Sequence, residues 1–225
     1  MAKLYIVATP IGNLEDITFR AIKTLKEVDF IICEDTRVTK FLLNHFGIEK
    51  PFIVANAFNE TKTIERIIDK INSGENAALV SDAGTPAISD PGTRLVNAAV
   101  KNSIEVIGIP GANAAILALS ISGLPTDSFV FEGFLPQKKG RQKKLLQLSE
   151  EERTIVLYES TYRIEKLILE LNQYIPERQI VIARELTKKF EEVWRGKPSD
   201  ILSSLKDKIL KGEFVVIIAP KDFIM

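Results

Sequence analysis

The chain has 225 residues, of which 45% are hydrophobic, and it carries 30 basic and 30 acidic side chains. That length supports one large domain or two small ones, and the balanced charge excludes a broadly basic nucleic-acid-binding surface. A single cysteine excludes a disulfide framework, and no apolar run approaches the roughly 18 residues of a membrane span. The short apolar start before Pro10 is not a signal peptide. We therefore expect a soluble, cytoplasmic protein.

Short β-branched runs alternate with amphipathic stretches over the first 120 or so residues. Asp16 is expected to cap the first helix, and Pro91 to be the first residue of the fourth. This alternation predicts an α/β domain with an open, mostly parallel sheet. The predicted strands are 3–9, 30–36, 51–58, 76–82 and 103–110, and the predicted helices are 16–28, 38–46, 61–72, 91–102 and 111–122.

A second set of elements follows the Gly-Leu-Pro-Thr sequence at 123–126, which is the best candidate for a linker. We therefore predict two α/β domains, 1–122 and 127–225, the second with a more mixed sheet. Its predicted strands are 129–134, 154–160, 179–185, 193–196 and 213–220, and its predicted helices are a basic one after Gln137, then 162–174 and 199–210.

Ligands of open α/β sheets bind at the carboxyl ends of the strands. Four predicted strands end in loops rich in small or polar residues, at 9–13, 34–37, 81–86 and 110–114. Turn formation alone explains any one of these loops, but four on one edge predict a binding site. Asp82 is open to two interpretations, since it can contact a ligand or bond its own backbone.

Several common motifs are missing from the sequence. The first loop, A-T-P-I-G-N, lacks the G-x-G-x-x-G dinucleotide fingerprint, and no G-x-x-x-x-G-K-S/T phosphate loop occurs. No C-x-x-C or H-E-x-x-H sequence occurs, so no metal site is predicted. Dehydrogenase, P-loop and nucleotide-hydrolase functions are therefore disfavoured.

One combination of motifs is more specific: TPIGNLEDIT, EDTR, SDAGTPAISDPG, PGANA, FEGFLP, KKGR and ARELTKKFEE. Together they closely resemble the small-subunit ribosomal RNA methyltransferase I family, from Lys3 to about Pro220. This family belongs to the tetrapyrrole-methylase fold. The resemblance implies an S-adenosylmethionine-dependent enzyme that methylates the ribose 2′-oxygen of a cytidine in 16S rRNA at the decoding centre. It also suggests a homodimer.

The resemblance implies that the cofactor binds in a cleft between the two domains. Tetrapyrrole methylases proper carry a glycine-rich first loop and a Gly-Asp-Pro motif, whereas this chain has TPIGN and SDAGTP. That departure argues against a porphyrinoid substrate. The positions that match the family's cofactor contacts are Pro10, Gly12, Asp82, Ala83, Gly84, Gly111 and Ala112 in the first domain, and Ser160, Ala183, Leu186, Gly212 and Val215 in the second.

A basic run at 137–144 carries five cations and no acid. A neutral protein that binds RNA needs such a local patch, because phosphate contacts supply much of the affinity. Taken alone, such a run is better explained as a solvated helix face, and it is the resemblance that favours RNA contact. Phe131 and Phe134, just before it, can stack on unpaired bases. The predicted RNA contacts are Lys138, Lys139, Arg141, Lys143 and Lys144.

The implied chemistry is methyl transfer by in-line displacement, which needs positioning and a group that removes or stabilises charge. The candidates are Glu34, Asp35, Arg37 and Lys188, and sequence does not choose among them. Arg37 can equally pair with Asp35 as a purely structural bridge. Two alternative functions stay open: methylation of a tetrapyrrole-like molecule or a protein, and non-catalytic RNA binding in ribosome assembly.

Overall fold

The computed structural model describes residues 2–55 and 60–223. The chain divides into two compact units, Met1–Asn113 and Ala114–Met225, each built around one five-stranded sheet. None of the helices in these described ranges is long and apolar enough to cross a membrane.

The sheet of the first unit has the order β3-β2-β4-β1-β5, and all its strand pairs are parallel. Every residue of β2 and β4 is buried, because helices cover both faces of the sheet. The predicted parallel sheet is confirmed. Its strands are β1 (Lys3–Val7), β2 (Phe30–Cys33), β3 (Phe52–Val54), β4 (Ala77–Val80) and β5 (Glu105–Ile109).

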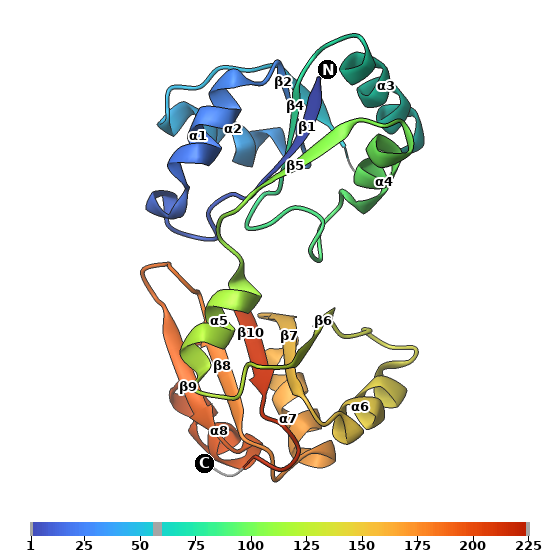
Figure 1. The fold of residues 1–225 in the computed structure, drawn as a ribbon. Helices are drawn as coiled ribbons and strands as arrows, with labels where there is room; N and C mark the ends of the chain where they lie inside the picture. The colour runs from blue at the N-terminus through green and yellow to red at the C-terminus, as the bar shows by residue number, and fades with distance from the viewer. Residues whose placement is uncertain (1, 56–59, 224–225) are drawn as a thin grey trace. The chain divides into compact units, whose positions relative to one another are not determined.

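Two layers of helices enclose this sheet (Figure 1). One apolar cluster joins α3 and α4 to one face, and a second joins α1 and α2 to the other. Part of the predicted third strand, 56–58, lies outside the described residues. The helices are α1 (Phe19–Glu27), α2 (Thr36–His45), α3 (Glu60–Asn72) and α4 (Thr93–Lys101), with a 3-10 turn η1 at Leu14–Asp16.

Two predicted helix starts are wrong. Asp16 lies in the 3-10 turn, and Thr18 caps α1 by accepting a hydrogen bond from the amide of Ala21. Pro91 precedes α4, whose cap is Gly92 with φ +136°. A methyl group on Gly92 would lie 2.8 Å from Leu79 Cδ2, so packing against β4 sets this corner.

The second unit has a mixed sheet of order β6-β7-β10-β8-β9, as predicted. Only the β6–β7 pair is parallel, and the other three pairs are antiparallel. Its strands are β6 (Phe129–Phe134), β7 (Thr154–Ser160), β8 (Ile180–Arg184), β9 (Glu192–Gly196) and β10 (Glu213–Ile218).

One large apolar cluster packs α6, α7 and α8 against this mixed sheet. Figure 1 shows α5 on the opposite side, across the middle strands. The helices are α5 (Ala114–Ser122), α6 (Arg141–Glu150), α7 (Ile164–Tyr174) and α8 (Pro198–Ser204), followed by a 3-10 turn η2 at Leu205–Asp207.

The division between the units falls before α5, whereas the sequence places it after that helix, at 123–126. Arg195 Nη2 donates to the carbonyl of Ile121 at 2.6 Å, and Thr154 Oγ1 donates to that of Pro125 at 2.5 Å. These bonds hold both α5 and the predicted linker within the second unit.

Candidate functional site

The carboxyl edge of the parallel sheet brings together the four predicted loops. Thr9 and Gly84 exchange two backbone hydrogen bonds, of 2.9 and 3.1 Å, which join the loops after β1 and β4. Thr85 Oγ1 donates to the carbonyl of Ala112 at 3.0 Å, and Asp82 Oδ1 accepts from the amide of Asp35 at 3.3 Å. The loop after β4 therefore contacts each of the other three, as the parallel topology predicts.

Two glycines of these loops allow the close approach. Gly84 has φ +89°, and a methyl group there would lie 3.3 Å from Ile11 Cγ2. A methyl group on Gly111 would lie 2.9 Å from Ala8 Cβ, which is closer than real side chains pack. Both glycines are thus required by contacts between the loops themselves. Pro10 is partly exposed, while Gly12, Ala83 and Gly111 present exposed backbone.

Asp90 and Ser81 also organise this edge, and sequence reasoning assigned them no such role. Ser81 Oγ donates to Asp90 Oδ2 at 2.6 Å, and the same hydroxyl accepts from the amide of Ala83 at 3.3 Å. The carbonyl of Ser81 accepts from Thr9 Oγ1 at 2.9 Å. These bonds fix the backbone on both sides of Asp82. Ser81 and Asp90 are nine residues apart, and no local pattern marks the pair.

Glu34, which directly follows β2, has a carboxyl group with a strongly raised pKa. Burial raises the pKa of its carboxyl from 4.5 to about 7, and the negative charges of Asp90 and Asp82 add to the effect. The side chain lines a small cavity of about 20 Å³ together with Leu79, Pro91 and other apolar residues. Burial also raises the pKa values of Asp82 and Asp90. A carboxyl group with the pKa of Glu34, about 7, accepts or releases a proton near neutral pH.

Asp35 and Arg37 form a local pair. Asp35 caps α2 by accepting from the amide of Arg37 at 2.8 Å, and its carboxylate also binds the guanidinium, with Nε at 3.0 Å from Oδ1. The hydrogen bonds from Arg37 lower the pKa of Asp35 to about 2. This geometry matches the structural-bridge interpretation of the pair.

Cys33 is buried in β2, and burial raises the pKa of its thiol. The ring of His45 packs edge-to-face on that of Phe46 at 4.8 Å. Among the described residues, no three acidic, cysteine or histidine side chains are grouped so that they could hold a metal ion.

The predicted cofactor residues of the second unit lie on or beside three neighbouring strands. Ser160 of β7 is opposite Glu213 of β10, and Val215 is opposite Ala183 of β8. Ala183, Leu186 and Val215 are buried.

Gly212 precedes β10 with φ +111°, and it exchanges hydrogen bonds of 2.6 and 2.7 Å with Thr161 Oγ1. A side chain there would overlap the carboxylate of Glu185. The sequence missed Thr161 and Glu185, because their roles depend on contacts with a distant segment.

Lys188 lies in the turn after β8. Its ammonium group bonds Glu185 Oε1 at 2.9 Å and Glu213 Oε2 at 2.8 Å. Burial lowers the pKa of Lys188, but the hydrogen bonds to Glu213 and Glu185 outweigh it and raise the pKa above its ordinary value. Lys188 therefore keeps its charge at neutral pH.

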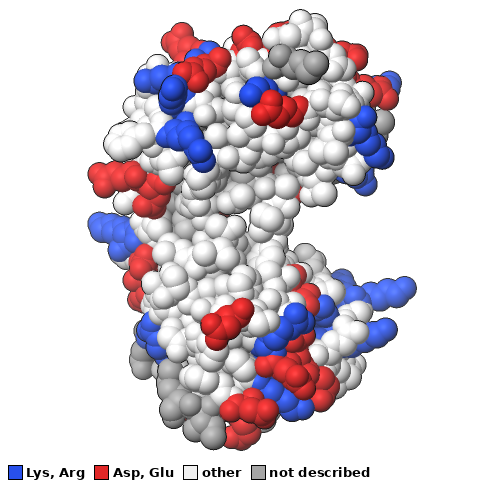
Figure 2. Space-filling view, viewed as in Figure 1, with Lys and Arg blue, Asp and Glu red and all other residues white. Residues whose placement is uncertain are grey.

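The basic run at 137–144 contains exposed lysines and cations that form ion pairs within the second unit. Lys138, Lys139 and Lys143 are exposed, and Figure 2 shows Lys and Arg atoms projecting from the side of the second unit where Figure 1 places α6. Lys144 pairs with Glu132 at 2.6 Å. Arg141 is only 4% exposed, which contradicts its prediction as a surface RNA contact. Its guanidinium is bound inside the unit instead.

Residues 3–202 match the family described as Tetrapyrrole (Corrin/Porphyrin) Methylases. Two solved structures share the fold. Diphthine synthase aligns with TM-score 0.75 at 13% identity, over 97% of this chain and 90% of that one. Cobalt precorrin-4 methyltransferase aligns with TM-score 0.71 at 16% identity, over 96% and 94%. The family match thus assigns the chain to the tetrapyrrole methylases, and the two solved structures show that it shares their fold.

Closer relatives refine this assignment. A protein from Halalkalibacterium halodurans is 50% identical over 216 residues, covering 96% of this chain and 75% of the relative. One from Thermotoga maritima is 46% identical over 222 residues, covering 99% and 100%. Both are named ribosomal RNA small subunit methyltransferase I. The chain belongs to the ribosomal RNA small subunit methyltransferase I family, which confirms the resemblance read from its motifs.

Proposed function

We propose that this chain transfers a methyl group from S-adenosylmethionine to the ribose 2′-oxygen of a cytidine in 16S rRNA. The observation that carries the proposal is the identity of about half of all residues, over nearly the whole chain, with relatives named for methylation of small-subunit ribosomal RNA. The four loops that meet at the carboxyl edge of the first sheet support it, because that is where such a fold holds its ligand.

The residues present fit the cofactor. Exposed backbone at Gly12, Ala83 and Gly111 permits the close approach of a bent molecule. The carboxylate of Asp82 engages the amide of Asp35 through Oδ1, and a carboxylate can accept further bonds from an amino or hydroxyl group. The residues that we assign to the cofactor are Pro10, Gly12, Asp82, Ala83, Gly84, Gly111 and Ala112 of the first unit, and Ser160, Ala183, Leu186, Gly212 and Val215 of the second.

S-adenosylmethionine supplies, when bound, a methyl group on a positively charged sulfur. The chain must hold the ribose oxygen in line with the methyl–sulfur bond, so that the carbon–oxygen bond forms as the carbon–sulfur bond breaks. The 2′-hydroxyl proton then needs an acceptor. We assign this role to Glu34, because it directly follows β2 at the carboxyl edge of the sheet, and because a raised pKa of about 7 suits a base near neutral pH.

The other candidates suit different roles. The pKa of Asp35 is about 2, so it is a weak base, and its bond to Arg37 serves the start of α2. Lys188 stays protonated and is suited to stabilise negative charge rather than to accept a proton.

We assign phosphate contacts to Lys138, Lys139 and Lys143, which are exposed cations in a chain with no net charge. Lys144 is a weaker candidate because Glu132 already neutralises it. Phe134, with 52% of its surface exposed, is available to stack on an unpaired base.

We also propose that the protein is a cytoplasmic homodimer. Light scattering of the pure protein then gives about twice the 25.1 kDa of one chain. A mass of one chain at working concentration contradicts this part of the proposal alone.

The decisive experiment is methylation of small ribosomal subunits purified from a deletion strain, using labelled S-adenosylmethionine. We expect label on one cytidine ribose of 16S rRNA. Label on no RNA, with intact cofactor binding in calorimetry, would favour a tetrapyrrole-like or protein substrate. Failure to bind S-adenosylmethionine would favour a non-catalytic assembly factor.

A further inference from the structure

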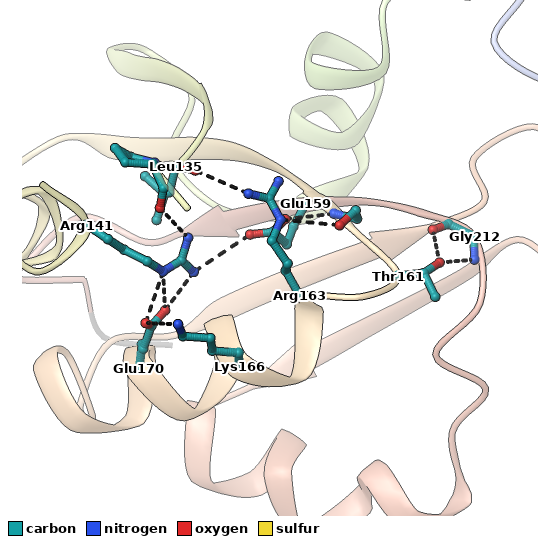
Figure 3. A network of polar contacts seen from close by, with 10 residues as sticks. Leu135, Arg141, Glu159, Thr161, Arg163, Lys166, Glu170 and Gly212 are labelled. Carbon is teal, nitrogen blue, oxygen red and sulfur yellow. Dashed lines mark hydrogen bonds and ion pairs between the residues drawn. The ribbon is translucent and has the colours of Figure 1, made fainter. Parts of the chain in front are cut away.

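A network of charged side chains lies beneath the segment that joins β6 to α6 (Figure 3). Glu159 comes from β7 and Glu170 from α7, while Arg141 begins α6 and Arg163 precedes α7. The side chains of Glu159 and Arg141 are 0% and 5% exposed. The network is therefore an interior structure, although it lies next to the exposed lysines of the basic run.

Glu170 fixes the orientation of Arg141. Arg141 Nε lies 3.0 and 2.8 Å from the two oxygens of Glu170, and its Nη2 lies 2.6 Å from one of them. The remaining arm, Nη1, donates to the carbonyl of Pro136 at 3.1 Å. A guanidinium held on one side by a carboxylate thus presents a donor to the backbone on the other.

Glu159 fixes Arg163 in the same way. Glu159 Oε1 lies 2.8 Å from Arg163 Nε and also accepts from the amide of Ser160 at 2.8 Å. Arg163 Nη1 donates to the carbonyl of Leu135 at 3.4 Å, and the guanidinium carbon lies 5.8 Å from the ring centroid of Phe134. The two arginines together hold three consecutive residues, 134–136.

Stability alone does not account for this arrangement. Buried ion pairs lose much of their Coulomb attraction to desolvation, and apolar packing of similar volume is often as stable. Glu159 Oε2 has no hydrogen-bond partner within 2–55 and 60–223, and it faces Arg141 Nη2 at 3.8 Å. What the arginines provide, and apolar side chains cannot, is donors to the carbonyls of Leu135 and Pro136.

We propose that Arg141 and Arg163 are positioning residues for RNA recognition. They fix the backbone at 134–136, so that the ring of Phe134 and the ammonium groups of Lys138 and Lys139 are presented to RNA in one arrangement. This inference rests on the proposed function, because it requires that the lysines contact RNA. A preformed surface avoids the ordering cost that a mobile segment incurs on binding.

Arg141→Lys tests the inference, because lysine keeps the positive charge and loses the planar fork. Arg178→Lys is the matched control. Arg178 is also buried, and it donates to the carbonyls of Leu148 and Ala219 at 3.1 and 2.7 Å, away from the segment 134–136. We expect both variants to lose stability, and only Arg141→Lys to bind unmethylated small ribosomal subunits about tenfold more weakly.

The salt dependence of binding separates positioning from direct contact. Arg141→Lys should weaken binding without changing the slope of log affinity against log salt, because no phosphate contact is lost. The double variant Lys138→Ala/Lys139→Ala should lower that slope by about one for each contact removed. Calorimetry with S-adenosylmethionine should give unchanged affinity for all three variants.

Three results would overturn the inference. Arg141→Lys could bind subunits as tightly as the parent protein, it could weaken binding no more than Arg178→Lys does, or it could change the salt slope as a lost phosphate contact does. If Arg141→Lys does not fold, Glu170→Gln removes the charge that orients Arg141 and should give the same loss. If Lys138→Ala/Lys139→Ala binds subunits as tightly as the parent protein, the assignment of these lysines to RNA contact is refuted. If that variant still methylates 16S rRNA, the proposed reaction is unaffected.

Discussion

Gly84→Ala tests the carboxyl-edge site most directly, because this glycine lies where three loops meet. Its φ of +89° is costly for a residue with a side chain, by about 1–2 kcal/mol. The added methyl group would lie 3.3 Å from Ile11 Cγ2 and 3.7 Å from the carbonyl oxygen of Ala112. Ile11, in the loop after β1, must therefore shift by a few tenths of an ångström, whereas the distance to Ala112 is an ordinary van der Waals contact. The sheet beneath the loops should keep its pairing.

Gly74→Ala is the matched control. Gly74 has φ +108°, and no atom lies within 4 Å of a methyl group built there. It lies between α3 and β4, at the amino end of that strand. The control therefore carries a similar conformational cost without any displacement of the carboxyl-edge loops.

Both variants should lose about 1–2 kcal/mol of unfolding free energy, and Tm should fall by about 2–4 °C for each kcal/mol. Calorimetry with S-adenosylmethionine should show normal affinity for Gly74→Ala and about tenfold weaker binding for Gly84→Ala, which corresponds to about 1.4 kcal/mol. Equal affinities of the two variants for S-adenosylmethionine would refute the assignment of this edge to the cofactor.

Three further predictions concern single groups. Because the pKa of Glu34 is raised from 4.5 to about 7, the folded protein binds an extra proton between these values, so the contribution of Glu34 to the unfolding free energy is fully present below pH 4.5 and falls as the pH rises to about 7. Denaturant titrations of Glu34→Gln should lack this fall, and curves parallel to the parent between pH 5 and 8 would contradict it. Ser81→Ala leaves the carboxylate of Asp90 without its 2.6 Å donor and should weaken S-adenosylmethionine binding severalfold in calorimetry, by about 1 kcal/mol. An unchanged affinity would show that the other bonds of the loop are sufficient to hold it. Gly212→Ala should displace Glu185 and lower methylation of subunits, and an unaltered rate would show that the Glu185 contacts are dispensable.

The period of apolar residues was sufficient to predict most elements. The predicted strand 154–160 coincides with β7, because an unbroken run of β-branched and apolar residues at 154–158 follows the charged residues at 151–153. The helix boundaries were less accurate. Proline favours the first helical position, yet α4 starts at Thr93, because the corner at Gly92 must pack on Leu79 of β4. The preference of proline for the first helical position was therefore overridden by the contact of Gly92 with Leu79, which the sequence around Pro91 does not reveal.

The loops of the site were predictable for a different reason. Parallel topology places the carboxyl ends of all strands on one edge, so the loops containing Gly12, Asp35, Asp82 and Ala112 had to be neighbours once the strand order was fixed. The state of each side chain was not predictable. Arg141 looked like part of a solvated basic run, but it is buried, and its partner Glu170 is 29 residues further along the chain.

In both units, a carboxylate orients a second side chain, which in turn forms a hydrogen bond to the backbone of a proposed binding loop. In the first, the carboxylate of Asp90 binds Ser81, whose hydroxyl accepts the amide of Ala83. In the second, the carboxylate of Glu170 binds Arg141, whose guanidinium donates to the carbonyl of Pro136. Asp90 and Glu170 are both partly buried, and a carboxylate withdrawn from water is costly unless it is paired, so each one favours the arrangement in which its partner is in place. Asp82 in the first unit and the exposed lysines in the second lie close to these pairs, and the charge of Asp82 adds to the raised pKa of Asp90. We therefore expect acidic residues behind a proposed binding loop to affect ligand binding without touching the ligand.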